Sequence, residues 1–196
     1  GVGFLIPLEP TAEQAVAATR AWVEHAVIGL NLCPFAKAVQ VKNRVRYACN
    51  EARDTAALHA ALRDELQRLA DTPIEETETT LLVHPWARQD FLVYNDFLDD
   101  AESLLCEMGL EGTLQIASFH PDYRFAGSAA HDIDNATNRS PYPCLHLLRE
   151  ASIERAVAAF PEAEAIYETN LRTLRTLGSQ GWAALQARCL REAVSR

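Results

Sequence analysis

The chain of 196 residues lacks the features that mark several large classes of protein. No apolar run approaches the roughly 18 to 20 residues that a membrane-spanning helix needs. Low-complexity tracts are absent, and with 48% hydrophobic residues the composition is not that of a disordered chain. The length suits one domain with a core of its own. We therefore expect a single folded domain and no membrane partner.

Cysteine is present in an odd number, five, and no two cysteines stand close together in the sequence. This is not the pattern of a small secreted disulfide scaffold, so we expect a reducing, cytoplasmic location. The first residues also lack the basic start and apolar core of a secretion signal. We treat residues 1–10 as a terminal extension outside the fold.

Positive charge is scarce. Lys and Arg total 18 against 27 Asp and Glu, which gives a formal net charge of −9. An acidic chain is repelled by phosphate backbones, so we expect no nucleic-acid partner. The densest basic group, Lys42, Arg44 and Arg46, is explained more simply as a solvated strand face than as a polyanion site. A small-molecule substrate or ligand is the expected partner, and the sequence leaves room for a homo-oligomer.

Several motifs of nucleotide, hydrolase and metal sites are missing. No P-loop and no G-x-G-x-x-G stretch follows a strand, so no nucleotide cofactor is expected. There is no G-x-S-x-G elbow, which removes the usual α/β-hydrolase reading. The tight metal spacings H-E-x-x-H and C-x-x-C and the haem attachment C-x-x-C-H are also absent. Any metal or haem must then be held by residues distant in the sequence.

The hydrophobic pattern predicts alternating strands and helices through the middle of the chain. Helices are expected after three capping residues, Thr11, Asp54 and Asp90. Strands are expected over residues 44–51, 79–83, 113–119 and 144–148. This order favours parallel neighbours, with the fourth strand at an edge or antiparallel. We expect an α/β fold: a three- to four-stranded, mostly parallel sheet covered by helices, with a C-terminal helical extension.

The C-terminal part of the chain reads as helical. Ser152 is expected to cap a short helix, and Pro161 to start a longer one that Gly178 ends. We therefore expect one α/β domain over residues 11–178 and a helical appendage over residues 179–196. Between the strands and these helices, the stretch from about residue 122 to 143 is irregular. A loop of about 20 residues is uncommon inside a compact domain unless it forms a site or a lid.

Two of the predicted strands end in the same way, with a His-Pro pair at His84 and at His120. Ligands of open α/β sheets bind beyond the carboxyl ends of the strands. If these strands are parallel neighbours, they lie about 4.8 Å apart and both imidazoles emerge on one rim. The irregular loop returns just before His146, which brings a third imidazole near. The alternative is that each histidine simply fills a strand end and hydrogen-bonds to a loop carbonyl.

Imidazole and carboxylate groups together are ligands for transition metals. His84, His120 and His146 are therefore the candidate ligands for iron, zinc or copper. Asp122 is a further ligand or orients them. Haem is a variant of the same idea, with His120 or His146 as axial ligand. The leading hypothesis is a small cytoplasmic enzyme, metal- or haem-dependent and redox, in which His120 and Asp122 are also catalytic.

Arginine and tyrosine side chains in and after the irregular loop suit substrate binding. Arg124 and Arg139 are able to clamp a carboxylate or phosphate in bidentate fashion, and Tyr142 to position the substrate. Arg139 is also counted among the catalytic candidates. Equally, Arg139 has the alternative role of tying the loop down through an ion pair with one of its aspartates.

Cys33 is the candidate nucleophile. It lies just past the first predicted helix, in a stretch unlike a solvated loop. A thiol becomes a nucleophile or redox group where a histidine or a helix end lowers its pKa, whereas most free cysteines are buried and act as small hydrophobic residues. A second hypothesis is therefore a metal-free thiol or acid–base enzyme that uses Cys33 and a histidine. The third is a non-enzymatic module that binds a small ligand or a protein.

Five phrases of the sequence together resemble an uncharacterised bacterial family of domains of unknown function. They are GLNLCPFAK at 29–37, TLLVHP at 80–85, YNDFLD at 94–99, ASFHPDY at 117–123 and NRSPYP at 138–143. The resemblance covers roughly residues 11–178. It implies no activity, cofactor or catalytic residue, so the candidate site rests on the residues alone.

Overall fold

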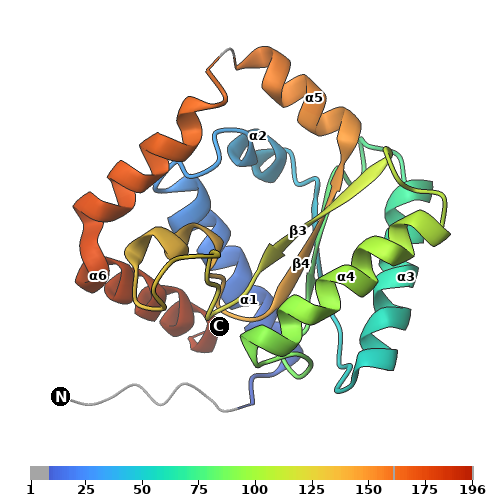
Figure 1. The fold of residues 1–196 in the computed structure, drawn as a ribbon, viewed down its shortest axis with the longest axis horizontal. Coiled ribbons are helices and arrows are strands. Elements are labelled where there is room, and N and C mark those ends of the chain that lie inside the picture. The colour runs from blue at the N-terminus through green and yellow to red at the C-terminus, as the bar shows by residue number, and fades with distance from the viewer. Residues whose placement is uncertain (1–8, 161, 196) are drawn as a thin grey trace.

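The computed structural model describes residues 9–160 and 162–195, so most of the predicted extension and the predicted helix start at Pro161 lie outside the described residues. The chain alternates helices and strands and ends in two helices (Figure 1). In chain order the elements are α1 (Ala12–Trp22), the π-helix η1 (Val23–Ile28), α2 (Ala36–Val41), β1 (Val45–Cys49), α3 (Thr55–Asp71), β2 (Thr79–Val83), α4 (Phe91–Glu107), β3 (Leu114–Phe119), the 3₁₀-helix η2 (Ile133–Asn138), β4 (Cys144–Arg149), α5 (Glu150–Ala159) and α6 (Ala165–Val194).

The four strands form one sheet in the order β1-β2-β4-β3. The pair β1–β2 is parallel, whereas β4 runs antiparallel to both β2 and β3. The predicted α/β architecture is confirmed, but the prediction of a mostly parallel sheet was wrong. The fourth strand is antiparallel as one of the two expectations had it, yet it lies inside the sheet. Its side chains are fully buried on both faces of the sheet, Cys144 on one face and Leu145 and Leu147 on the other. A strand that is apolar on both faces suits a position between two neighbouring strands.

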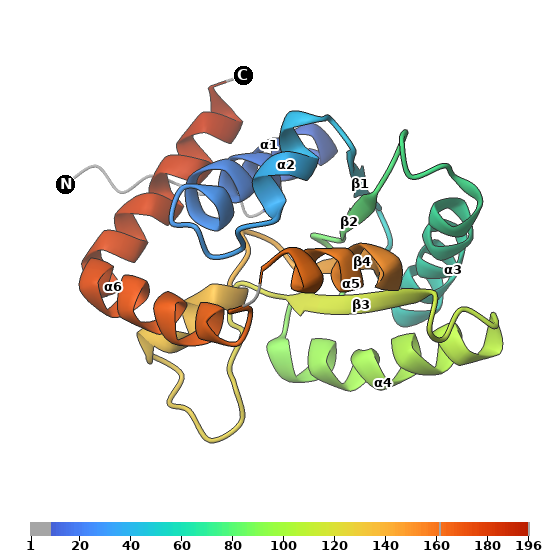
Figure 2. The ribbon, with the colours of Figure 1, turned by 90° about the horizontal axis from the view of Figure 1, so that it is seen from above.

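Helices cover both faces of the sheet and create two apolar cores (Figure 2). One core joins α3 and α4 to the face that carries Leu82, Leu145 and Leu147. The other joins α1 and α6 to the opposite face, which carries Leu81 and Cys144. The alternation of side chains along β4 sends neighbouring residues into different cores. This alternation determines which of the candidate site residues lie on the same face of the sheet.

The predicted helix starts are confirmed where an acidic or hydroxyl residue caps the first turn. Thr11 and Gln14 form a reciprocal capping box at α1. Asp54 accepts from the Ala57 N–H at 2.8 Å, and Asp90 from the Val93 N–H at 3.2 Å. The expected cap at Ser152 was wrong: the N-cap of α5 is Arg149, three residues earlier, because the chain passes from β4 into the helix without a loop.

The C-terminal helix α6 contains one non-helical residue, Gly178, with φ 73° and ψ 171°. Beyond this residue the helix packs Trp182 and Cys189 into the core that it shares with α1. Among the described residues, no helix is both long and apolar enough to cross a bilayer.

Arg149, the last residue of β4, fixes the end of α3. Its Nη2 donates to the carbonyl oxygens of Leu69, Thr72 and Thr77 at 3.1, 2.7 and 2.7 Å. These carbonyls belong to the last turn of α3 and to the turn that follows it, where the helix itself offers no donors. One guanidinium therefore joins the end of the central strand to the α3–β2 connection.

Candidate functional site

His84 and His120 lie on the same face of the sheet, at the carboxyl ends of β2 and β3, and both are fully buried. Because β4 lies between these strands, they are separated by two strand spacings, about 9.6 Å. The ring of Tyr94 from α4 fills the space between them. Its centroid lies 5.8 Å from that of His84, in a stacked arrangement, and 5.0 Å from that of His120.

The hydroxyl of Tyr94 fastens this end of the sheet. It donates to the carbonyl oxygen of Cys144 at 2.7 Å and accepts from the N–H of Phe119 at 3.0 Å. Cys144 is the first residue of β4 and Phe119 the last residue of β3, and the two are paired. Burial raises the pKa of Tyr94 well above its usual value, so the hydroxyl stays protonated and keeps its donor. Tyr94 is therefore a structural link between helix and sheet.

His120 uses both ring nitrogens. Its Nδ1 accepts from the backbone N–H of Asp122 at 3.0 Å, so Nε2 carries the proton and donates to the carbonyl oxygen of Arg88 at 3.2 Å. Burial lowers the pKa of His120, which favours this neutral form. The carboxylate of Asp122 itself is on an exposed residue, and only its backbone meets the imidazole.

His84 uses one ring nitrogen. Its Nδ1 donates to the carbonyl oxygen of Ala87 at 3.0 Å, which leaves Nε2 as a buried acceptor without a partner among the described residues. Burial lowers the pKa of His84 to about 4, so the ring is neutral at pH 7. Both histidines thus bind carbonyls of the loop that joins β2 to α4, as the simpler of the two sequence interpretations expects.

His146 lies on the opposite face of the sheet, where its ring approaches Phe119 with 6.1 Å between centroids. The hydroxyl of Thr79 donates its proton to the carbonyl oxygen of Leu147. The same hydroxyl oxygen lies 2.7 Å from Nε2 of His146, so it accepts a hydrogen bond from the Nε2–H of the imidazole. Burial lowers the pKa of His146 to about 4. The structure therefore does not bring His146 to the other two histidines. The physical reason is the alternation along β4, which sends His146 toward α1 and α6.

Cys33 is half-buried in the turn between η1 and α2, on the side of the molecule formed by α1 and α6. The neighbouring carbonyl of Leu32 accepts from the Asn170 side chain of α6 at 2.9 Å. Among the described residues, the imidazoles of His84 and His120 contact aromatic rings and backbone groups on the other face of the sheet, and not Cys33.

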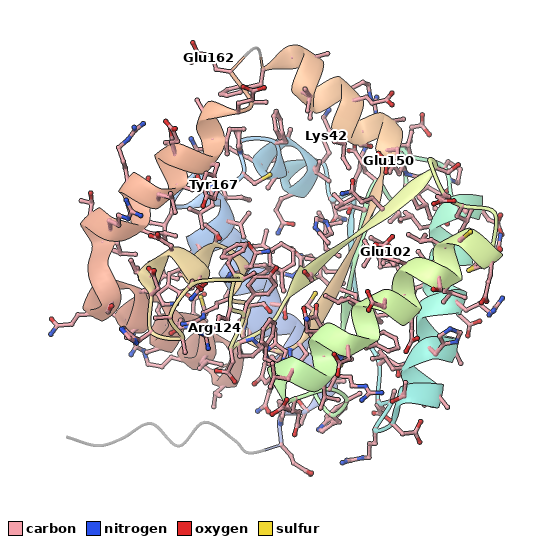
Figure 3. All side chains as sticks on the ribbon, viewed as in Figure 1. Lys42, Glu102, Arg124, Glu150, Glu162 and Tyr167 are labelled. Atoms are coloured by element: carbon pink, nitrogen blue, oxygen red, sulfur yellow. The ribbon has the colours of Figure 1, made fainter. Side chains whose placement is uncertain are left out.

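The arginines of the irregular loop bind the loop itself. Arg139 donates to the carbonyl oxygens of Tyr123, at 3.0 Å, and Ala130. Arg124, labelled in Figure 3 on the loop that follows β3, donates to the carbonyl of Ser128 at 2.6 Å. Arg139 ties the loop down as one alternative expected, but through carbonyls and not through an aspartate.

Two neighbours of these arginines also have structural partners. Asp134 of η2 pairs with Arg175 of α6 at 2.7 Å. Tyr142 is half-buried and packs against the core of α1 and α6, and burial raises its pKa. The structure thus spreads the predicted substrate-binding residues over the loop and the second core, and not around a common space.

The donor atoms near the two strand-end histidines do not fit a metal ion. Of their four ring nitrogens, three already bind backbone groups, and the hydroxyl of Tyr94 binds two more. Over residues 9–160 and 162–195, no group of three or more His, Cys, Asp or Glu side chains is arranged to hold a metal ion.

A pocket of about 280 Å³ lies beyond the carboxyl ends of β1 and β2, directly in front of the loop that the histidines hold. We call it the strand-end pocket. Its lining residues come from the two loops and from the first turns of α3 and α4: Arg53, Asp54, Thr55, Trp86, Arg88, Gln89, Asp90 and Val93.

Most of these lining residues were missed by the sequence analysis. Trp86 and Arg88 follow the His84-Pro85 pair directly, and this position was the available signal. Parallel β1 and β2 bring Arg53 beside Trp86, with the guanidinium 5.7 Å from the indole ring, and no local pattern announces that contact. The strand-end pocket thus lies at the end of the sheet where the sequence predicted a site, but residues other than the predicted histidines line it.

The loop behind the pocket is strained and incompletely paired. Arg88 has a left-handed backbone, with φ 56°, which is uncommon for a residue other than glycine. The Nε–H of Arg88 and the indole N–H of Trp86 are buried without a hydrogen-bond partner among the described residues. Buried donors normally find partners, and these two unpartnered donors lie within three residues of each other on the loop that lines the pocket.

The charges of the strand-end pocket are mixed. Arg53 and Arg88 are its cations, and Asp54 and Asp90 its anions. Both aspartates already accept from backbone N–H groups as the caps of α3 and α4. The two arginines have no such partner within the pocket. Each capping bond uses one carboxylate oxygen, Oδ1, and the buried polar atoms of the pocket that have no partner, on Trp86 and Arg88, are both donors.

Comparison with known proteins gives a family but no activity. Residues 14–184 match the model of a family described as "Protein of unknown function (DUF1415)". The resemblance to an uncharacterised family is thereby confirmed. No curated protein and no solved structure gives a significant match to the chain. What the protein does must therefore be argued from the geometry of its site.

Proposed function

We propose that this chain, which belongs to the DUF1415 family of proteins of unknown function, binds a small organic molecule in the strand-end pocket. This develops the third of the sequence hypotheses, a small-ligand module, and places the ligand beside Trp86 and Arg88. The observation that carries the proposal is the pair of buried, unpartnered donors on the loop that forms the wall of the pocket. Small-molecule sites are concave, largely preformed and equipped with a few polar groups.

The two histidines support this proposal through the loop. His84 holds the carbonyl of Ala87, and His120 holds that of Arg88, so two consecutive peptide groups are fixed from behind. A site needs its contact residues held within a fraction of an ångström, and it depends on supporting hydrogen bonds for that precision. The buried imidazoles supply such support without entering the pocket themselves.

The dimensions of the pocket limit the ligand. A volume of about 280 Å³ lies just below the range of roughly 300 to 1,000 Å³ that is typical of ligand sites. The pocket thus suits a molecule of metabolite size. Trp86 and Val93 provide apolar surface, and the arginines, Thr55 and Gln89 provide polar contacts.

The test is a fragment screen by ligand-observed NMR, with a variant that fills the pocket. Val93→Trp places a large ring in the pocket, at a residue that is 40% exposed. Leu92→Trp is the matched control, because Leu92 is the adjacent residue, 72% exposed, and not part of the lining. We expect fragments that bind the wild type to bind Leu92→Trp and to be lost from Val93→Trp. An empty screen, or equal binding to both variants, contradicts the proposal.

The metal- or haem-dependent redox enzyme stays a prediction, as does the thiol enzyme that uses Cys33. The geometry favours ligand binding over both, because His146 contacts Phe119 and Cys33 follows Leu32, and both of these neighbours belong to the core on the other face of the sheet from His84 and His120. Metal analysis and an absorption spectrum of the untagged protein test the first prediction. Alkylation of Cys33 as a function of pH tests the second. The cytoplasmic location and a homo-oligomeric state also stay predictions.

A further inference from the structure

We infer that the ligand of the strand-end pocket is an anion, a small molecule whose carboxylate or phosphate group accepts hydrogen bonds from Arg88 and Trp86. This inference rests on the proposed function and adds the chemical class of the ligand. It concerns the pocket residues and not the histidines behind them.

The unpartnered polar atoms of the pocket are donors. The Nε–H of Arg88 and the N–H of Trp86 are able only to donate, so a ligand completes them only by bringing acceptors. The carboxylates of Asp54 and Asp90 each use Oδ1 to bind the first turn of their own helix, and none of the buried, unpartnered atoms on the lining residues is an acceptor. A carboxylate or phosphate carries several acceptor oxygens close together and matches a guanidinium in bidentate fashion.

The two cations lack strong partners. No carboxylate of the described residues forms an ion pair with Arg88, whose guanidinium lies 5.9 Å from the ring of Phe97. Arg53 approaches Glu9 at 3.6 Å, and both side chains are about two-thirds exposed, at 66% and 70%. An exposed ion pair at this distance is weak and gives way easily. The exposed guanidinium of Arg53 is thus able to turn to an anion, and that of Arg88 has no carboxylate partner to compete with one.

The backbone of the pocket also favours a negatively charged ligand. The first turns of α3 and α4 line the pocket, and each helix has 17 residues. A helix of this length carries roughly half a positive charge at its N-terminus. The full negative charge of each aspartate cap exceeds this half charge, and the two arginines restore a small net positive charge to the pocket. In a chain with a net charge of −9, the strand-end pocket is a local site where an anion is stabilised.

The experiment compares anions with neutral molecules of the same shape. Benzoate and phenyl phosphate are titrated into the ¹⁵N-labelled full chain, beside benzamide and phenol as neutral counterparts. The chain has three tryptophans, and Trp86→Phe removes one of the three indole N–H signals and so assigns it. Arg88→Gln removes the inferred partner. Arg68→Gln makes the same change of charge at an exposed residue of α3, about 20 Å along the helix from Thr55.

We expect one or both anions to shift the Trp86 indole signal and to bind at least tenfold more tightly than the neutral counterparts. The comparison of benzoate with phenyl phosphate then distinguishes a carboxylate from a phosphate ligand. Binding should weaken at least tenfold in Arg88→Gln and be unchanged in Arg68→Gln. Should Arg88→Gln fail to fold, Arg53→Gln takes its place with a smaller expected loss, and the wild-type comparison stands by itself.

Two sets of results overturn the inference and are distinguishable. If the neutral molecules bind as tightly as the anions, or Arg88→Gln binds the anions like the wild type, the ligand is not selected by charge. In that case the proposed binding of a small molecule in the pocket still holds. It also holds, while the inference fails, if the fragment screen finds ligands in the pocket but neither anion shifts the Trp86 signal. If no fragment and no anion binds, the proposed function fails, and the inference fails with it.

Discussion

The Nε2 atom of His120 lies 3.2 Å from the carbonyl oxygen of Arg88, a residue that stands 32 positions earlier in the chain. A histidine at the end of one strand thus holds the backbone of the loop that follows another. The residue it holds is in a left-handed conformation, with φ 56°. Strain of this kind persists where the surroundings determine the conformation, and it concentrates at functional sites. This contact connects the buried histidines to the strand-end pocket.

Replacing His120 by Ala should release the Arg88 loop. The change removes two hydrogen bonds, worth about 1 kcal/mol each, and leaves a buried cavity where the ring was. We expect the free energy of unfolding to fall by about 3 kcal/mol, measured by urea denaturation. His131→Ala is the control, because His131 is exposed, and it should change stability by less than about 0.5 kcal/mol. A loss below about 1 kcal/mol for His120→Ala would show that the contact does not hold the loop.

His146 should make the protein less stable in acid. Burial lowers its pKa from the ordinary value of 6.5 to about 4, so only the unfolded chain takes up a proton between these values. The histidine therefore does not change the free energy of unfolding above about pH 7. As the pH falls from 6.5 toward 4, protonation of His146 in the unfolded chain lowers the free energy of unfolding by about 3 kcal/mol in total.

The measurement is a series of unfolding curves of the wild type and of His146→Gln. The glutamine amide is able to keep the hydrogen bond to Thr79 but does not titrate. The difference in unfolding free energy between the two proteins should change by about 1.4 kcal/mol for each pH unit below 6.5. A difference that stays constant from pH 7 to pH 4 would contradict the prediction.

Trp86→Phe should separate stability from binding. The substitution keeps a flat ring but removes a buried donor that has no partner among the described residues. Removing an unsatisfied buried group costs nothing and is able to stabilise the free protein by up to about 1 kcal/mol. Binding of an anion to the strand-end pocket should weaken about tenfold, because the bond from the indole N–H is lost.

Thermal unfolding and an affinity titration of the same variant check this pair of effects. Trp182→Phe serves as the control, since Trp182 also has an unpartnered N–H but lies in the core between α1 and α6. It should leave anion affinity as it is. If Trp86→Phe lowers stability and preserves affinity, then the indole N–H has a structural role and the ligand does not use it.

Arg149→Ala should loosen the connection from α3 to β2. Three carbonyl oxygens lose their common donor, and bonds to a charged group are worth about 1.5 to 3 kcal/mol. We expect the unfolding free energy to fall by about 2 to 3 kcal/mol, and Arg149→Lys to recover only part of it, since an ammonium does not have the planar fork. Hydrogen exchange of the amides around Thr77 should speed up in Arg149→Ala. Full recovery by lysine would mean that charge alone matters.

Local patterns were sufficient for the elements themselves. The caps Asp54 and Asp90 and the apolar stripe of α3 are decided within one turn of helix or one face of it, so the sequence displays them directly. The order of the strands was not accessible in this way. β4 lies between β2 and β3 because its side chains are buried on both faces of the sheet. Which strand takes this central position depends on how all four strands pack together, and not on the sequence of any one strand.

The residues of the candidate site also separate into those that local sequence patterns predicted and those that depend on long-range pairing. The His-Pro pairs at His84 and His120 predicted where β2 and β3 end, because strand ends and proline stops are local features. That His146 points away follows from the pairing register of β4, and that Arg53 meets Trp86 follows from the parallel pairing of β1 with β2. Both contacts join residues far apart in the chain.

The sequence by itself therefore determined an acidic α/β domain, most of its helix and strand boundaries, and the end of the sheet at which the strands with His84 and His120 finish. The tertiary structure decided what lies there. Because a side chain in a sheet alternates between two faces, the strand order alone separates His146 from His84 and His120 and turns these two toward the loop. The same packing leaves Arg88 and Trp86, and not the imidazoles, in contact with the strand-end pocket.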